Sequence, residues 1–472
     1  MVAVTSPAFE ANARAALVDA KLQKALGHIK DGFIQRRTVA AARLPEFDAL
    51  RDLAKEIKDH TLNHLDLYLA HFERRVTESG GVVHWCRDAA EARETVLTIC
   101  RAAGAKSVTK GKSMVGEEIA LNDFLEQNGI EPVETDLGEY IIQLRREPPS
   151  HIIAPAIHVN KEQVAEAFRA AHTELPAGRL LEEPSALLAE ARAILRRKFL
   201  AADVGITGAN FLIAETGSTV IVTNEGNGDL TQMLPRVHVV LASIEKVVPT
   251  LEDVSTILRL LARSATGQEF SVYTTFSTGP RRPADLDGPE QFHVILLDNG
   301  RSAMLGTPFQ EMLRCIRCGA CLNHCPVYGA VGGHAYGWVY PGPMGAVLTP
   351  WLVGLDQAKH LPNASTFCGK CESICPMRIP LPGLMRRLRE RTHLERLDAP
   401  VARGALAAWS FLARRPRLYR AVAAITARTL ALLGGRARLL RRLPLARGWM
   451  QGRDMPAPEG RTFMSQWRER TR

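Results

Sequence analysis

Seven of the nine cysteines in this 472-residue chain fall within 61 residues, in two short runs with regular spacing. The first run, CIRCGACLNHCP at residues 315–326, contains Cys315, Cys318, Cys321 and Cys325. Its pattern is C-x2-C-x2-C-x3-C-P, the bacterial ferredoxin run, in which three thiolates bind one four-iron cluster and the fourth binds the other cluster. Gly319 in the middle of the run lets the backbone approach the cluster closely. The first run therefore predicts ligands for iron–sulfur clusters.

A zinc site is the alternative for this run. Structural zinc is usually bound by two CxxC units separated by a longer gap. Four cysteines spaced as tightly as those in residues 315–325 would crowd a single tetrahedral ion. The spacing favours iron–sulfur clusters over zinc.

The second run, STFCGKCESICP, occupies residues 365–376 and contains Cys368, Cys371 and Cys375. It matches the last three cysteine positions of the first run, and Ser365 stands where a fourth cysteine would complete it. In the ferredoxin pattern, the last cysteine of each run binds the cluster of the other run. We therefore expect one [4Fe-4S] cluster on Cys315, Cys318, Cys321 and Cys375. We expect the second cluster on Cys325, Cys368 and Cys371, with one iron that has no cysteine ligand.

The missing thiolate leaves several alternatives for the second cluster. Ser365 could bind iron through oxygen, the iron could keep water, or the cluster could contain three irons [3Fe-4S]. Ser365 could instead cap the turn that follows it. His324, His334 and His360 are further candidates, each expected first as an ordinary hydrogen-bonding histidine. In each case, the two clusters should differ in reduction potential, because ligand type tunes that potential.

Two clusters so close in sequence indicate an electron relay. No G-x-G-x-x-G follows a predicted strand and opens a helix, so the sequence offers no nicotinamide or flavin site that could feed the clusters. We therefore expect the chain to exchange electrons with partner proteins.

Ahead of the cysteines, the pattern predicts an α/β domain. Residues 1–70 are predicted to be helical, and residues 80–300 alternate β-branched runs with helix-like segments. The predicted strands lie in SVTKGKS, HIIAPAI, VGITGANFLIAETGSTVIVTNEG, VHVVLASIEKVV and FHVILLD. Such alternation is typical of a largely parallel sheet, whose ligand crevice lies at the carboxyl ends of the strands.

Polar residues follow two of the predicted strands. Lys112 and Ser113 come after SVTKG and could bind a carboxylate or phosphate. Glu215, Thr216 and Gly217 form a second polar group, for which a tight hairpin turn is the alternative. No metal-spaced partner lies near Cys86 or Cys100, which we expect to be buried thiols.

Charge is concentrated near the C-terminus. Residues 386–472 contain 21 arginines, no lysine and 6 acidic residues, a net charge of +15, whereas the whole chain has +10. We expect a basic helical region that packs on the chain's own acidic body or on a partner subunit, with an anionic lipid surface as an alternative. Nucleic acid is not expected, because no recognition motif accompanies the charge. The twin arginine Arg36-Arg37 precedes a polar segment, so it is not part of an export signal, and we expect a cytoplasmic protein.

The segments ADVGITGANFLIAETGSTVIVTNEGNGDL, CIRCGACLNHCPVYG and STFCGKCESICPMRIPLP, in this order and spacing, resemble the lactate utilization protein B family. The resemblance covers nearly the whole chain. It implies a helical segment at 1–70, an α/β LUD-type domain at 71–302, a ferredoxin-type domain at 303–390 and an arginine-rich helical region at 391–472. The front domain of that family is similar in fold to the sugar-phosphate isomerase and CoA-transferase group.

The resemblance also implies a function, namely electron transfer in the NAD-independent oxidation of L-lactate to pyruvate. The implied partners are a cysteine-rich subunit similar to heterodisulfide reductase subunits and a smaller protein that contains only the LUD domain. A quinone-linked acceptor and a peripheral position on the inner membrane are compatible with this role. Another 2-hydroxy acid, such as glycolate, is an alternative substrate of the system.

Two hypotheses from different classes remain at this stage. In the first, the chain is an electron-transfer subunit that is not catalytic alone. In the second, the α/β crevice binds a hydroxy acid or acyl substrate directly, with Lys112 as the anion clamp and Glu215 as base or nucleophile.

Overall fold

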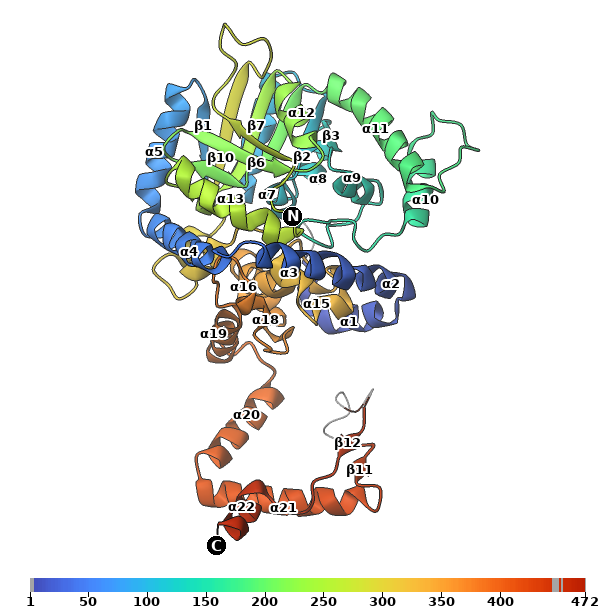
Figure 1. The fold of residues 1–472 in the computed structure, drawn as a ribbon, viewed down its shortest axis with the longest axis vertical. Helices are drawn as coiled ribbons and strands as arrows, with labels where there is room; N and C mark the ends of the chain where they lie inside the picture. The colour runs from blue at the N-terminus through green and yellow to red at the C-terminus, as the bar shows by residue number, and fades with distance from the viewer. Residues whose placement is uncertain (1–3, 444–449, 451–452, 472) are drawn as a thin grey trace. The chain divides into compact units, whose positions relative to one another are not determined.

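The computed structural model describes residues 4–443, 450 and 453–471. The chain divides into two compact units, Met1–Thr392 and His393–Arg472. Both cysteine runs lie in the first unit, together with the α/β domain (Figure 1).

A six-stranded parallel sheet forms the centre of the first unit, with the strand order β1-β10-β7-β4-β2-β3. Its strands are β1 Val82–Cys86, β2 Ser107–Gly111, β3 Glu131–Glu134, β4 Val204–Gly208, β7 Val237–Ser243 and β10 Gln291–Leu297. Strands β4 and β7 are buried along their whole length, as expected for a parallel sheet that is covered on both faces. Because the strands are parallel, their carboxyl ends meet at one edge.

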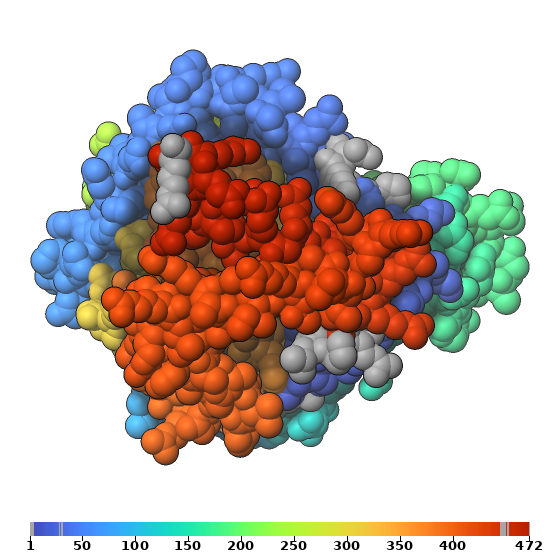
Figure 2. Space-filling model, turned by 90° about the horizontal axis from the view of Figure 1, so that it is seen from below, coloured from blue at the N-terminus to red at the C-terminus, as the bar shows by residue number. Residues whose placement is uncertain are grey.

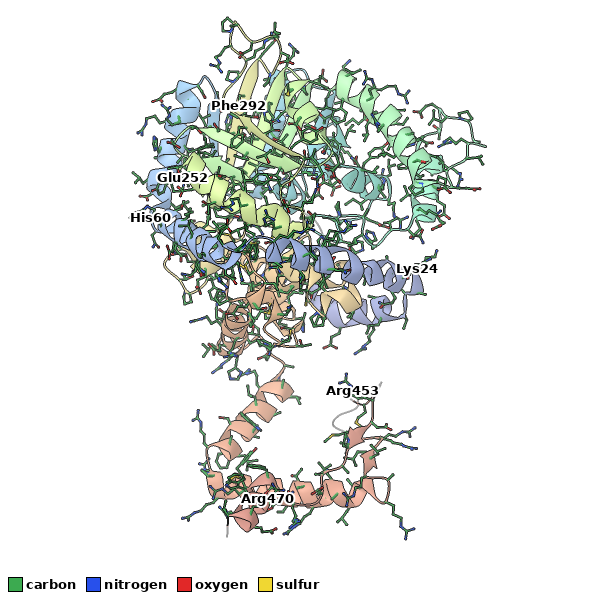
Figure 3. The ribbon with its side chains drawn as sticks, in the orientation of Figure 1. Lys24, His60, Glu252, Phe292, Arg453 and Arg470 are labelled. Atoms are coloured by element: carbon green, nitrogen blue, oxygen red, sulfur yellow. The ribbon has the colours of Figure 1, made fainter. Side chains whose placement is uncertain are left out.

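Alternate residues of the central strands pack against different layers. Val239 and Leu241 of β7 pack with the helices on one face, whereas Val240 and Ala242 pack on the other face. The helices around the sheet are α6 Ala89–Ala102, α7 Met114–Glu118, α8 Leu121–Gln127, α9 Leu137–Leu144, α10 Lys161–Ala171, α11 Pro184–Ala201, α12 Asn227–Met233 and α13 Leu251–Ala265. Figure 3 labels Phe292, which is buried between these layers.

A second, four-stranded sheet has the order β8-β5-β6-β9. Its strands are β5 Phe211–Ile213, β6 Ser218–Thr223, β8 Val247–Val248 and β9 Tyr273–Ser277. The β5–β6 pair is an antiparallel hairpin, the alternative that the sequence offered for residues 215–217.

Helices precede and follow the α/β domain. The N-terminal helices are α1 Phe9–Val18, α2 Ala20–Ile29, α3 Gln35–Ala42, α4 Phe47–Asn63 and α5 Leu65–Glu78. The cysteine region contains α14 Ala320–Asn323, α15 Tyr328–Val331, α16 Gly342–Leu352, α17 Leu355–Ala358, α18 Lys370–Ser373 and α19 Leu381–Leu394. The architecture is thus a parallel-sheet α/β domain followed by a helical ferredoxin-type region.

One predicted strand is wrong. The segment HIIAPAI at residues 151–157 forms bends and turns. Its apolar residues do not alternate on a sheet; Ile152 and Ile153 instead line cavities between the α/β domain and the first cysteine run. A short apolar run has the same appearance in sequence whether it fills a sheet or a junction between domains.

The second unit, His393–Arg472, contains α20 Pro400–Ala413, α21 Pro416–Gly434, the short pair β11 Leu439–Leu440 and β12 Met455–Pro456, and α22 Phe463–Arg470. Large apolar side chains on α20 and α21 are exposed, among them Trp409, Phe411 and Ile425. Figure 2 shows these two helices, coloured orange, as continuous surface. Within the described residues, no helix is long and apolar enough to span a membrane.

Candidate functional site

The two cysteine runs have the same local backbone. Arg317 and Gly319 adopt left-handed conformations with φ of 57° and 71°, and the equivalent Phe367 and Gly369 have φ of 54° and 77°. A short helix follows each glycine, α14 in the first run and α18 in the second. Ser365 therefore occupies the position in the second turn that Cys315 occupies in the first.

Gly319 also permits close packing of the first turn. A Cβ atom at this position would lie 3.1 Å from the ring of His151 and 3.3 Å from Ile153. Together with its left-handed backbone, this approach favours glycine.

Four cysteines from the two runs line one small cavity. They are Cys315, Cys318, Cys321 and Cys375. The remaining lining is mostly apolar and includes Ile152, Met344, Ile379 and Leu381. The cavity brings together residues that are up to 60 positions apart in sequence. These four cysteines are the ones that the ferredoxin pattern predicts as ligands of one cluster.

The thiols in this cavity are buried beside one another. Burial, followed by the neighbouring charge of Cys375, raises the pKa of Cys318 to about 12. Burial also raises the pKa of Cys375 to about 11 and that of Cys321 well above its usual range. Such thiols ionise beside a strong positive charge, and bound metal supplies that charge and deprotonates its thiol ligands. The donor set therefore fits an iron–sulfur cluster.

The other three cysteines form a second electrostatic group. Burial, followed by the charge of Cys325, raises the pKa of Cys371 to about 12, and Cys368 also contributes to the shift. The pKa of Cys325 is raised by burial, and Cys368 adds to the shift. Cys368 itself is exposed, and the backbone N–H of Lys370 lowers its pKa. This group contains the three residues expected at the second cluster.

A site for a single metal ion differs in geometry from a site for a four-iron cluster. Across residues 4–443, 450 and 453–471, no three His, Cys, Asp or Glu side chains are grouped to hold a single ion. A four-iron cluster needs a wider arrangement, because each cysteine binds a different iron.

Ser365 has a defined structural contact. Its hydroxyl accepts a hydrogen bond from the backbone N–H of Phe367 at 3.1 Å. This bond stabilises the turn that leads to Cys368, although the N-cap of α18 itself is Gly369. Among the histidines, the ring of His324 pairs with the carbonyl of Ala320 and that of His334 with the carbonyl of Pro148.

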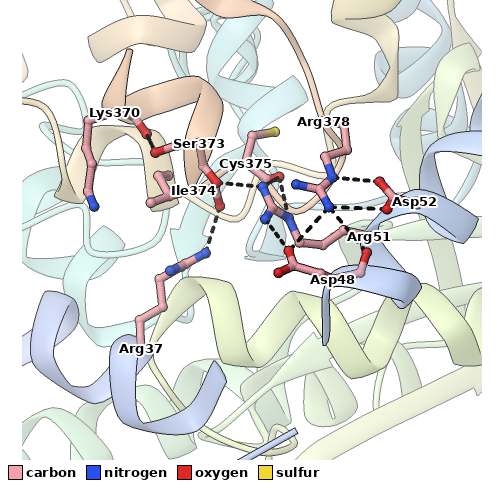
Figure 4. A network of polar contacts seen from close by, with 9 residues as sticks. All are labelled: Arg37, Asp48, Arg51, Asp52, Lys370, Ser373, Ile374, Cys375 and Arg378. Carbon is pink, nitrogen blue, oxygen red and sulfur yellow. Dashed lines mark hydrogen bonds and ion pairs between the residues drawn. The ribbon is translucent and has the colours of Figure 1, made fainter. Parts of the chain in front are cut away.

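Two buried arginines of the N-terminal helices hold the turn that carries Cys375 (Figure 4). Arg37 donates to the carbonyl of Ile374 at 2.8 Å. Arg51 donates to the carbonyl of Cys375 at 2.7 Å and to that of Ser373 at 2.7 Å. The N-terminal helices therefore position a candidate cluster ligand more than 300 residues away in sequence.

Sequence reasoning missed this role. In the sequence, Arg37 stands out only as part of the twin arginine, and Arg51 lies on a helix with ordinary amphipathic spacing. The usable signal was the apolar character of the positions around them, which predicts that this helical face is buried.

Lys112 and Ser113 lie at the carboxyl edge of the parallel sheet, directly after β2, as the sequence predicts. Ser113 accepts a hydrogen bond from the N–H of Gly116 at 3.0 Å and caps α7. The ammonium of Lys112 lies 3.0 Å from Asp136 and 3.1 Å from Glu225, and despite burial these carboxylates raise its pKa. Lys112 is thus already neutralised by two acids.

Glu215, Thr216 and Gly217 lie elsewhere, at the β5–β6 turn. The Glu215 carboxylate accepts the N–H of Leu251 at the start of α13, at 3.0 Å. A Cβ at Gly217 would lie 2.6 Å from the backbone nitrogen of Val76 in α5, so this turn packs tightly against that helix. The structure does not bring Glu215 together with Lys112 in one crevice.

A cavity of about 150 Å³ lies beside Lys112 and Ser113. Its lining includes two residues that the sequence did not suggest, Lys246 and Arg317. Lys246 follows the carboxyl end of β7, and Arg317 lies between Cys315 and Cys318 in the first cysteine run. The cavity therefore joins the α/β crevice to the first cluster motif.

A buried charge network crosses the same junction. Arg301 pairs with Glu118 at 2.7 Å and with Glu245 at 3.0 Å. Arg317 pairs with Glu245 at 3.1 Å and lies over the ring of Tyr340. Burial alone would raise the pKa of Glu245, but the charges of Arg301 and Arg317 outweigh it and lower the pKa to about 2.

The fold and the two cysteine groups define an iron–sulfur protein in which an α/β domain precedes a ferredoxin-type region. The LUD domain family matches residues 69–297, and the 4Fe-4S dicluster domain family matches residues 311–379. Lactate utilization protein B of Bacillus licheniformis is 43% identical over 437 residues, which cover 92% of this chain and 91% of that protein. Its counterpart in Bacillus subtilis strain 168 is 42% identical over 441 residues, covering 92% and 90%. The chain belongs to the lactate utilization protein B family.

A solved structure of a DUF162 family protein from Deinococcus radiodurans covers 49% of this chain and 98% of its own. With 14% identity and a TM-score of 0.28, this likeness carries no argument about function.

Proposed function

We propose that the chain is an electron-transfer subunit with two [4Fe-4S] clusters that acts in the NAD-independent oxidation of L-lactate to pyruvate. The observation that carries this proposal is the cavity lined by four cysteines from both runs, Cys315, Cys318, Cys321 and Cys375. The names of the relatives, lactate utilization protein B, support the substrate.

The proposed ligands of the first cluster are these four cysteines. Cys325, Cys368 and Cys371 are the proposed ligands of the second, with Ser365 at the fourth position of that turn. When bound, such clusters accept and release single electrons.

The surrounding residues support a relay. The cavity lining is mostly apolar, and Cys318 and Cys375 are buried in it. The charge of Arg37 acts on the thiols of Cys318 and Cys375, so it offsets negative charge at the same place. Apolar surroundings and a nearby cation are both means by which a protein sets the potential of a cluster.

An electron relay needs a donor and an acceptor. We propose that a cysteine-rich subunit similar to heterodisulfide reductase subunits and a small LUD-domain subunit fill these positions. The exposed apolar and arginine side chains of α20 and α21 offer a docking surface for a subunit. A quinone is the proposed final acceptor.

The test is reduction of the clusters by L-lactate. The reconstituted chain would be combined anaerobically with its two proposed partners, and the visible absorbance of the clusters followed after L-lactate is added without NAD. We expect bleaching with L-lactate and a smaller absorbance change when Cys321→Ala replaces the wild-type chain, because that variant keeps only the second cluster. Bleaching by glycolate but not L-lactate would assign a different 2-hydroxy acid. If dithionite bleaches the clusters and no 2-hydroxy acid does, the proposed role is refuted.

A further inference from the structure

The cavity beside the first cluster motif is lined by two buried cations whose polar groups are not all paired. Lys246 is 7% exposed, and its ammonium has no hydrogen-bond or ion-pair partner within the described part of the chain. The Arg317 side chain is 10% exposed, and its Nη1 atom is buried with no hydrogen-bond acceptor among the described residues. Buried cations are normally paired, so two incomplete ones on a single cavity indicate a missing anion.

The buried charges around this junction also favour an anion in the cavity. On the Glu245 side of the cavity, the buried cations are Arg301, Arg317, Lys246 and Lys58, and the carboxylates are those of Glu118 and Glu245. Lys58 donates to the carbonyls of Glu245 and Val247. Arg301 pairs with both carboxylates, and Arg317 also pairs with Glu245. Before the thiolate of Cys315 is counted, the charge on this side of the cavity is therefore positive. On the other side, Asp136 and Glu139 line the cavity beside Lys112.

The apolar part of the lining favours a small organic anion over inorganic phosphate. Ile152, Ile153, Val222 and Leu241 give the cavity apolar walls. A volume of about 150 Å³ is well below the ~300–1,000 Å³ of a drug-sized site, so the occupant has few heavy atoms.

Two neutral groups could recognise a second oxygen on such a ligand. Asn210 uses its Oδ1 to accept the N–H of Val222 at 2.9 Å, and its Nδ2 has no partner among the described residues. The Ser113 hydroxyl accepts from Gly116 and retains its own proton to donate. Both residues line the cavity.

A larger cavity of about 930 Å³ lacks these features. Its charged lining is mainly acidic, including Glu117, Asp123, Glu126 and Glu147. It contains none of the cluster cysteines, so we assign it no anion.

We propose that the 150 Å³ cavity binds a small 2-hydroxy or 2-oxo monocarboxylate, with Lys246 and Arg317 pairing with the carboxylate and Asn210 and Ser113 facing its 2-oxygen. This cavity shares Lys112 and Ser113 with the crevice expected from the sequence, but Glu215 does not line it. The inference rests on the proposed function in one respect: Arg317 belongs to the turn that would hold the first cluster.

The position of Arg317 couples the two sites. A carboxylate bound there adds negative charge beside Cys315, which stabilises the oxidised form of the cluster and lowers its reduction potential. By thermodynamic reciprocity, reduction of the cluster must weaken carboxylate binding by the same free energy. Tenfold weaker binding to the reduced form corresponds to a potential lower by about 59 mV.

The experiment uses the reconstituted full-length chain under anaerobic conditions. Binding of L-lactate, pyruvate and inorganic phosphate would be measured by calorimetry, and the cluster potential by EPR-monitored titration with and without pyruvate. The variants are Lys246→Met and Arg317→Gln. Lys106→Met is the matched control, an exposed lysine just before β2, at the opposite edge of the sheet.

We expect pyruvate or L-lactate to bind the wild type and Lys106→Met alike, and at least tenfold more weakly to Lys246→Met and Arg317→Gln. We also expect the potential to fall when pyruvate is added to the wild type and to stay unchanged in Lys246→Met. If the charge of the cluster alone balances these cations, neither carboxylate will bind and the proposal is refuted. Binding of phosphate alone, or carboxylate binding that both variants retain, would also refute it.

Iron and sulfide would be counted in the same samples. Full iron content without carboxylate binding would refute this inference and leave the proposed relay standing. Low iron content in the wild type would refute the relay instead. Because Arg317 adjoins two cluster ligands, its variant counts as evidence only with wild-type iron content, and Lys246→Met provides the independent case.

Discussion

Arg301 offers a quantitative test of the charge network that joins the α/β domain to the first cysteine run. Its side chain is fully buried and pairs with Glu118, which is also fully buried, and with Glu245, which is 2% exposed. Tyr340 donates a further hydrogen bond to Glu118 at 2.8 Å, and Asn299 donates another at 2.7 Å. Replacing Arg301 by methionine keeps much of the volume and removes the cation.

Loss of one partner from a buried ion pair costs about 3–5 kcal/mol, because the remaining charge is uncompensated. Glu245 keeps Arg317, and Glu118 keeps its two hydrogen bonds, so we expect Arg301→Met to lie near the lower end, at about 3 kcal/mol. Adding Glu118→Gln removes the carboxylate that Arg301→Met leaves without its cation. The double variant should therefore recover about 1–2 kcal/mol relative to Arg301→Met alone.

The loss of stability caused by Arg301→Met should also depend on pH. In the wild type, burial opposes ionisation of Glu118, but Arg301 outweighs it and lowers its pKa, and the pKa of Glu245 is lowered to about 2. Their contribution is therefore fully present above the ordinary carboxylate pKa and is lost only as the pH falls through these lower values. Without Arg301, burial raises the pKa of Glu118, so the folded variant binds more protons than the unfolded chain. Its stability should rise as the pH falls from 7 to 5, and its deficit relative to the wild type should shrink.

The assay is urea unfolding of the iron-free chain, followed by circular dichroism at pH 7 and pH 5. Arg282→Met is the control, because this arginine is 84% exposed and its pair with Asp285 spans 3.6 Å. We expect the control to change stability by less than about 0.5 kcal/mol. An Arg301→Met variant as stable as the control, or a double variant less stable than the single one, would refute the reasoning.

Three further predictions concern the clusters and the C-terminal unit. Cys321→Ala should lower the iron content by about one cluster's share. Cys100→Ala removes a buried thiol outside the cysteine runs and should leave the iron content unchanged. Equal iron content in both variants would contradict the ligand assignment. Ser365→Ala should retain all iron and lose about 1 kcal/mol or less, because its hydroxyl holds a local turn; loss of about one iron per chain would instead make Ser365 a ligand. Removal of residues 393–472 should leave iron content unchanged, because Met1–Thr392 forms its own compact unit, so loss of iron on truncation would contradict this division.

The cysteine runs and most central strands could be predicted because their signals are local. Two-residue gaps between cysteines and β-branched runs such as residues 237–243 report on a few neighbouring positions. The same is true of Lys112 and Ser113, which follow a predicted strand and lie at its carboxyl edge as expected.

The remaining features depend on contacts between distant segments. Arg51 holds the carbonyl of Cys375 across 324 positions, and no spacing pattern connects the two residues. Arg317 and Lys246 meet only because β7 and the first cysteine turn approach the same cavity. Glu215 looked like a partner of Lys112 in sequence, but the β5–β6 hairpin carries it away from that edge.

The most direct test of the central claim is the iron and sulfide content of the anaerobically reconstituted chain, measured together with EPR spectra of its oxidised and reduced forms. Two [4Fe-4S] clusters predict about eight irons and eight sulfides per chain, with signals that develop on reduction. About seven irons with a signal in the oxidised form would indicate a three-iron cluster on Cys325, Cys368 and Cys371. About four irons, or one zinc, per chain would contradict the two-cluster relay.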